Sequence, residues 1–122
     1  MACILLIDDD DLLRNVLSKA LTHAGHTVLQ AEDGAQGLDI FRATNVDLVL
    51  TDLIMPVREG VETIMTLKRE RPNLPIIAMS GDASNSALYL SIAAKIGAKH
   101  ILPKPFTPQE LLQVIDGVLP KP

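Results

Sequence analysis

Five short apolar runs alternate along this chain of 122 residues with segments in which apolar residues recur at helical spacing. The runs cover residues 4–7, 27–31, 48–51, 76–79 and 101–102. Each run has the length of a buried strand, whereas Leu13, Val16, Leu17 and Leu21 stand three and four positions apart, as in an amphipathic helix. Strict alternation is typical of a parallel sheet with helices on both faces. Because crossovers between parallel strands are right-handed, we predict an α/β fold with a doubly wound five-stranded parallel sheet and five helices.

The punctuation between these segments agrees with that division. Gly25 and Gly97 follow helical segments, where glycine commonly ends a helix. Thr107, Pro108 and Glu110 form a typical helix start before the last segment. No repeat or low-complexity tract interrupts the pattern, so we expect one domain over residues 1–122 and no output domain.

Composition narrows the class of protein. With 48% apolar and 21% charged residues the chain is globular, and its net charge of -4 argues against a nucleic-acid surface. A single cysteine, Cys3, allows no internal disulfide and fits a reducing compartment. No apolar stretch is long enough to span a bilayer, and no basic segment precedes the first run. We therefore expect a cytoplasmic protein that does not bind membranes.

Four consecutive aspartates, Asp8 to Asp11, follow directly on the first apolar run. A buried strand that ends in carboxylates presents them at its C-terminal end, where open α/β sheets bind ligands. Adjacent carboxylates repel one another unless a cation lies between them, and such oxygen ligands suit Mg²⁺. Asp10 and Asp11 are better explained as acids at the start of the next helix, where negative charge is favourable.

Polar residues at four strand ends should meet in one crevice. Asp8 and Asp9 follow the first strand, Asp52 the third, Ser80 the fourth and Lys104 the fifth. Three carboxylates, a hydroxyl and an ammonium can hold a divalent cation and a phosphoryl group, with one carboxylate attacking phosphorus. Each residue alone is weak support, but together they predict phosphoryl-transfer chemistry.

At these residues the chain resembles the receiver (CheY-like) domain of two-component response regulators, whose topology is flavodoxin-like. The resemblance covers essentially the whole chain. It rests on four motifs and a turn: Ile7-Asp8-Asp9, Asp52 with Met55-Pro56 and Glu59-Gly60, Ser80-Gly81, Lys104-Pro105-Phe106, and Ala31-Glu32-Asp33-Gly34.

The resemblance implies a metal site for Mg²⁺. Asp9 would bind the ion directly and Asp8 through water. Asp52 and the carbonyl of Ile54 would be further ligands.

The resemblance also implies the roles of the phosphoryl-binding residues. Asp52 would accept the phosphoryl group, Ser80 would be the switch hydroxyl, and Lys104 would bind the phosphate. A cis peptide is common in the family between this lysine and the following proline, here Pro105. Ile101 stands where receivers often have an aromatic residue, so a tyrosine-type rotamer switch is not expected.

The implied function is a phosphorylation-controlled switch that takes a phosphoryl group from a partner's phosphohistidine. The donor would be a histidine kinase or a histidine phosphotransfer protein, and the output a downstream effector protein or domain. The chain would catalyse only its own phosphorylation and dephosphorylation, so it is not expected to be an enzyme in the usual sense. The alternative is a degenerate receiver that acts only as a protein-interaction module.

Two other classes fit poorly. A flavin-binding protein would need a phosphate-cradling loop and aromatic rings, whereas the loop after the first strand carries four acids and the chain has one Tyr, two Phe and no Trp. An aspartyl phosphatase of the haloacid dehalogenase type would need a second acid two residues after Asp52, where this chain has Ile54.

Overall fold

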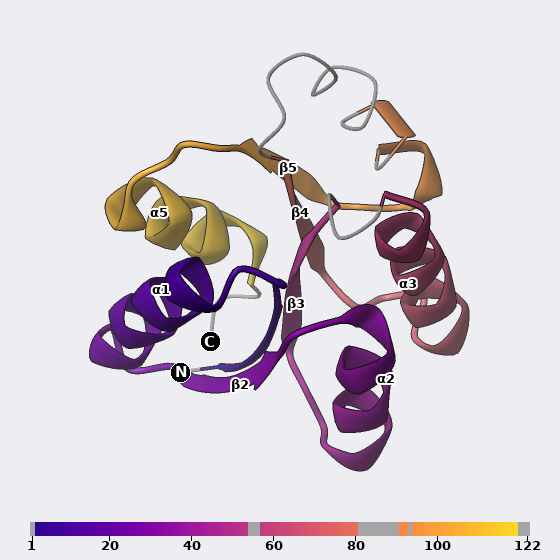
Figure 1. The fold of residues 1–122 in the computed structure, drawn as a ribbon, viewed down its shortest axis with the longest axis horizontal. Helices are drawn as coiled ribbons and strands as arrows, with labels where there is room; N and C mark the ends of the chain where they lie inside the picture. Colours follow the sequence, from indigo (N-terminus) through magenta and orange to yellow (C-terminus); the bar gives the residue numbers. More distant parts are fainter. Residues whose placement is uncertain (1, 54–56, 81–90, 93, 120–122) are drawn as a thin grey trace.

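The protein is described by a computed structural model over residues 2–53, 57–80, 91–92 and 94–119, and Figure 1 shows its fold. The strands are β1 (Cys3–Ile7), β2 (Thr27–Ala31), β3 (Leu48–Asp52), β4 (Ile76–Ser80) and β5 (His100–Pro103). They form one sheet in the order β2-β1-β3-β4-β5, and every neighbouring pair is parallel. The predicted doubly wound sheet is therefore confirmed, with all carboxyl ends of its strands at one edge.

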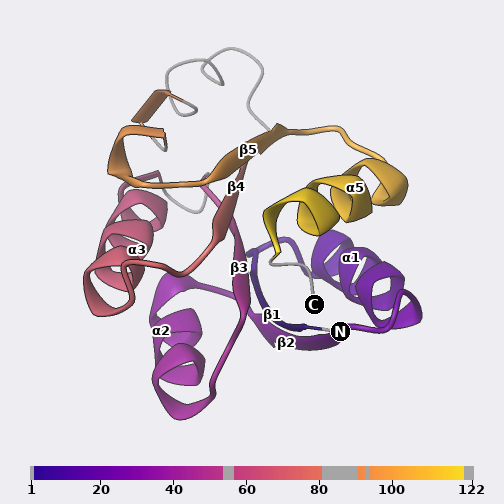
Figure 2. The same cartoon turned by 180° about the vertical axis from the view of Figure 1, so that it is seen from behind.

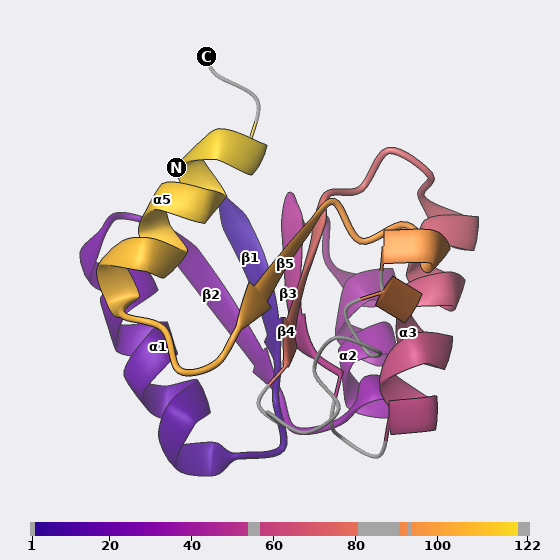
Figure 3. The ribbon, with the colours of Figure 1, turned by 90° about the horizontal axis from the view of Figure 1, so that it is seen from above.

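Helices cover both faces of this sheet. Their bounds are α1 (Asp11–His23), α2 (Gly34–Ala43), α3 (Val57–Glu70) and α5 (Pro108–Val118). The helices α1 and α5 lie on one face, and α2 and α3 lie on the other (Figures 2 and 3). Residues 91–92 and 94–96 are helical and lie beside α3, at the place of the predicted fourth helix. None of the helices described has the length and apolar character needed to cross a membrane.

The core has two halves because side chains alternate along each strand. On β1, Ile4 and Leu6 pack in the cluster that includes Leu17 of α1 and Leu111 of α5. Leu5 and Ile7 instead pack with residues on the α2 and α3 side, such as Phe41 and Ile64. Strands β3 and β4 are buried at all of their residues, as expected for central strands of a parallel sheet covered on both faces.

Capping side chains and glycines mark where the helices begin and end. Asp10 accepts a hydrogen bond from the Leu13 N–H and caps α1, which confirms the capping explanation for this acid. Thr107 and Glu110 form a reciprocal capping box at the start of α5. Gly25 and Gly97 have positive φ values of 101° and 109°, so the predicted glycine ends are also confirmed.

Two helical glycines allow a matched test of this packing. A Cβ on Gly37 of α2 would lie 2.5 Å from Cδ1 and 2.9 Å from Cγ1 of the buried Ile7, whereas a Cβ on Gly117 of α5 would meet nothing within 4 Å. We expect Gly37→Ala to lower the free energy of unfolding by about 1–3 kcal/mol, because overpacking outweighs the gain in helix propensity. Gly117→Ala should raise it by about 0.5–1 kcal/mol. Urea denaturation measures both, and stabilisation by Gly37→Ala would contradict the close contact with Ile7.

Candidate metal and phosphoryl site

Two buried carboxylates and one lysine form the centre of the site. Asp8 follows β1 and is 0% exposed, and Asp52 ends β3 and is 4% exposed. Lys104, which follows β5, places its Nζ 3.2 Å from Oδ2 of Asp8 and 3.2 Å from Oδ2 of Asp52. The structure thus brings together residues that lie as far as 96 positions apart in the sequence.

Asp9 completes an acidic triad at the same edge. Carboxylate oxygens of Asp8, Asp9 and Asp52 all lie within 4.8 Å of one another. Asp9 is exposed, while the other two are buried, so the triad opens toward solvent on the side of Asp9. Three hard oxygen donors at this spacing could hold a divalent cation such as Mg²⁺. Lys104 offsets only part of their charge, and three donors would leave the other positions of an octahedral cation to water.

Burial and neighbouring charges together shift the pKa values of Asp8 and Lys104. Burial raises the pKa of the Asp8 carboxyl, and the negative charge of Asp52 adds to the rise, although the Asp10 N–H and Lys104 oppose it. Burial lowers the pKa of Lys104, but the carboxylates of Asp52 and Asp8 outweigh this and hold it above its ordinary value. We therefore expect Lys104 to stay charged and Asp8 to resist ionisation when no cation is bound.

Ser80 lies at the end of β4, next to β3 in the sheet. Ser80 is 1% exposed. Its Oγ is buried and has no hydrogen-bond partner among the residues that the structure describes. An unpaired buried hydroxyl is unfavourable in free energy. The part of the chain that the structure describes therefore supplies a buried donor here without an acceptor for it.

Some sequence predictions fall outside the described residues. Ile54, whose carbonyl was predicted as a metal ligand, belongs to the residues that the structure does not describe, as do Met55, Pro56 and Gly81.

The peptide between Lys104 and Pro105 is cis, as the resemblance implied.

Sequence reasoning missed one residue of this site, Arg14 of α1. Its Nη1 donates to the carbonyl of Asp8 at 2.6 Å, and its Nη2 lies 2.6 Å from Oδ1 of Asp11. Only the spacing of Asp11 and Arg14, three residues apart on a predicted helix, could have suggested the ion pair. The contact with a backbone carbonyl has no signal in the sequence.

Comparison with known protein families gives a match to one domain family. Residues 4–116 match the response regulator receiver domain. Among curated proteins, the DNA-binding transcriptional regulator NtrC of Rhizobium meliloti (strain 1021) is 37% identical over 121 residues, which is 99% of this chain and 25% of that protein. The transcriptional regulatory protein CpxR of Escherichia coli (strain K12) is 37% identical over 116 residues, covering 95% of this chain and 48% of that protein. The chain thus spans about a quarter to a half of the length of these relatives.

Solved structures agree with the family match over the whole fold. The chemotaxis response regulator CheY4 of Vibrio cholerae aligns with a TM-score of 0.87 and 30% identity, over 98% of this chain and 99% of that one. A CheY-like receiver domain protein from Methanospirillum hungatei JF-1 aligns with a TM-score of 0.88 and 27% identity, over 96% and 92% of the two chains.

The raised pKa of Asp8 makes a pH-dependent prediction. A folded-state pKa above the unfolded one contributes stability below the unfolded pKa, and this contribution is lost as pH rises through the folded pKa. Asp8→Asn should therefore raise the Tm of the metal-free protein at neutral pH, and the gain should disappear below about pH 3.9. Thermal denaturation in EDTA across this range measures the effect.

The exposed Asp116 of α5 provides the control for this experiment. Asp116→Asn should change the Tm little at neutral pH, because the side chain is exposed. A lower Tm of Asp8→Asn than of the original protein at neutral pH would show that ionised Asp8 stabilises the metal-free fold.

Proposed function

Because this chain belongs to the response regulator receiver domain family, we propose that it is a phosphorylation-controlled switch of two-component signalling that accepts a phosphoryl group on Asp52. The donor is a phosphohistidine of a histidine kinase or histidine phosphotransfer protein. The observation that carries the proposal is the position of Asp52, buried at the end of a central strand beside Asp8, Asp9 and Lys104.

The acidic triad supports a requirement for Mg²⁺. When bound, the ion would neutralise the carboxylates and the oxygens of the incoming phosphoryl group. Asp8, Asp9 and Asp52 are the described residues that would hold it. Ile54, through its carbonyl, is the fourth ligand that we propose.

Asp52 is the nucleophile in this proposal. One of its carboxylate oxygens forms a bond to phosphorus, while the bond from phosphorus to the donor's imidazole nitrogen breaks and that nitrogen keeps the electron pair. Lys104 Nζ, which lies 3.2 Å from Asp52 Oδ2, is close enough to stabilise charge on the transferring oxygens. Loss of the phosphoryl group to water restores the starting carboxylate.

Ser80 links the phosphoryl group to the rest of the fold. Its buried Oγ, which has no partner within the described ranges, can donate to a phosphoryl oxygen on Asp52, and such a bond exists only in the phosphorylated state. The backbone carbonyl of Ser80 accepts from the Lys104 N–H at 2.6 Å, so β4 and β5 would respond together. We propose that an effector protein or domain binds the surface around β5.

The relative NtrC is a DNA-binding transcriptional regulator, and this chain matches 25% of its length. For this chain we propose an effector reached either in trans or through a further domain. We propose no direct contact between this chain and nucleic acid.

Asp52→Asn tests the phosphoacceptor. The amide cannot attack phosphorus, so incubation with acetyl phosphate and Mg²⁺ should give no phosphoryl mass increment in the intact-mass spectrum. Asp39→Asn, at an exposed position of α2, should be phosphorylated like the original protein. Equal phosphorylation of Asp52→Asn would refute the assignment. A complete lack of phosphorylation in the original protein would favour the interaction-module alternative.

Ser80→Ala tests signal transmission. This variant should still accept phosphate on Asp52, but it loses a charge-assisted hydrogen bond worth about 1.5–3 kcal/mol, or roughly ten- to a hundred-fold in the switch equilibrium. Changes in the NMR shifts of the amides of residues 94–102 on adding beryllofluoride, a phosphoryl mimic, should therefore be smaller than in the original protein. Thr22→Ala, at an exposed position of α1, is the control. Undiminished shifts in Ser80→Ala would show that another group carries the signal.

A further inference from the structure

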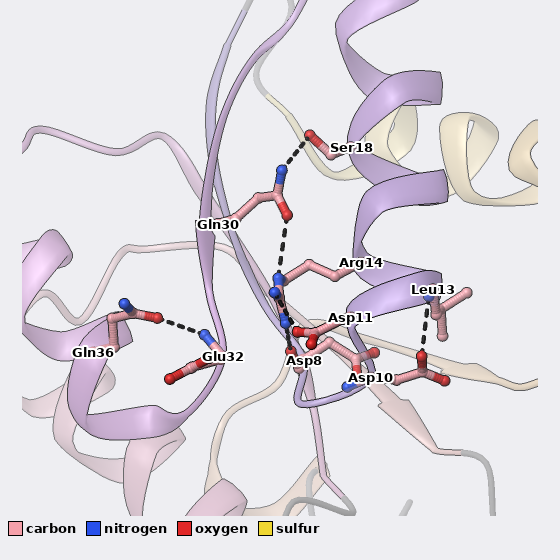
Figure 4. A network of polar contacts seen from close by, with 9 residues as sticks. All are labelled: Asp8, Asp10, Asp11, Leu13, Arg14, Ser18, Gln30, Glu32 and Gln36. Carbon is pink, nitrogen blue, oxygen red and sulfur yellow. Dashed lines mark hydrogen bonds and ion pairs between the residues drawn. The ribbon is translucent and has the colours of Figure 1, made fainter.

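We propose that Arg14 is a positioning residue for the metal site, because it fixes the peptide plane that joins Asp8 to Asp9. The inference rests on the proposed function in that the acidic triad is taken to bind Mg²⁺. Figure 4 shows Arg14 at the centre of a network that connects the start of α1, the end of β1 and the neighbouring strand β2.

Each nitrogen of the guanidinium has a separate acceptor. Nη1 donates to the carbonyl of Asp8 at 2.6 Å, Nη2 to Oδ1 of Asp11 at 2.6 Å, and Nε to Oε1 of Gln30 at 3.1 Å. Gln30 is held in turn, since its Nε2 donates to Oγ of Ser18 at 3.1 Å. The Arg14 side chain is 13% exposed. A rigid planar fork with three acceptors and little exposure is held in one orientation.

The bond to the Asp8 carbonyl matters because a peptide unit is planar. The carbonyl of Asp8, the N–H of Asp9 and both Cα atoms move as one body. Holding the carbonyl therefore fixes the Cα of Asp9, from which its side chain extends. The other side of Asp8 is already tied to β2, since its N–H donates to the carbonyl of Ala31 at 3.1 Å. Its carboxylate is oriented by the Asp10 N–H at 2.9 Å. Arg14 therefore restrains the peptide between Asp8 and Asp9, and through it the position of the exposed Asp9.

The ion pair with Asp11 has a second consequence. Asp11 is 74% exposed and could otherwise turn toward the cation. Arg14 holds its carboxylate, and Asp10 caps α1, so the two acids of this run that remain for the triad are Asp8 and Asp9.

Charge and positioning make opposite predictions for the loss of Arg14. If Arg14 acted only as a nearby positive charge, its removal would strengthen Mg²⁺ binding, because like charges repel. If it positions the ligands, its removal should weaken Mg²⁺ binding, as losses of groups that orient metal ligands do. The sign of the change therefore separates the two roles.

The test is a Mg²⁺ titration of the full chain without phosphodonor, followed by calorimetry and by the amide shifts of Asp8, Asp9 and Asp52. We expect Arg14→Met to raise the Kd for Mg²⁺ about tenfold. Arg14→Lys keeps the charge but not the fork, so its Kd should lie between those of the original protein and Arg14→Met. In acetyl phosphate assays, saturating Mg²⁺ should restore most of the phosphorylation rate of Arg14→Met.

Arg71 provides a matched control at the other end of the fold. Its Nη1 donates to the carbonyl of Val46 at 2.6 Å, so Arg71→Met removes the same kind of bond without touching the site. It should lower the Tm while leaving the Kd for Mg²⁺ unchanged. A Kd for Arg14→Met equal to or below that of the original protein would overturn the proposal. If Arg14→Met does not fold, the original Kd in Arg14→Lys would overturn it instead. Failure of the original protein to bind Mg²⁺ would contradict the proposed function itself.

Discussion

Two carboxylates are buried side by side at one edge of the sheet, and the rest of the structure serves to keep them there. Asp8 and Asp52 are almost inaccessible to solvent, and removing charged groups from water costs several kcal/mol per ion before compensation. Lys104 bridges both at 3.2 Å, yet burial still raises the pKa of Asp8. The metal-free crevice is therefore left short of positive charge. That shortage favours a divalent cation, which is why the proposed phosphoryl transfer to Asp52 includes Mg²⁺.

The parallel sheet makes this arrangement possible. Asp8, Asp52, Ser80 and Lys104 come from the ends of four different strands, and parallel strands place all those ends at one edge. Because β3 and β4 are covered on both faces, the polar residues that end them are buried with the apolar ones. The same burial leaves the Ser80 hydroxyl without a partner among the described residues, which is the observation behind the sensing role that we propose for it.

The acidic run after β1 is held by cations on two sides. Lys104 contacts the Asp8 carboxylate from β5, and Arg14 contacts the Asp8 carbonyl from α1. The first contact offsets charge, whereas the second sets the direction of the backbone. Gln30 and Ser18 extend the second contact to β2 and α1. The backbone that carries the acidic triad is thus tied to the edge strand β2 as well as to the residues that face the crevice.

The sequence by itself determined the class of fold, because the spacing of apolar residues differs between a strand and a helix and needs no tertiary contact to be seen. It also pointed to Asp8, Asp9, Asp52, Ser80 and Lys104, since each follows an apolar run and parallel topology brings such ends together. Only the tertiary structure decided how these groups ionise and pair. The spacing of residues along the sequence gives neither their burial nor the distances between strand ends. Arg14 was missed for the same reason: its main acceptor is a backbone carbonyl, which every residue carries.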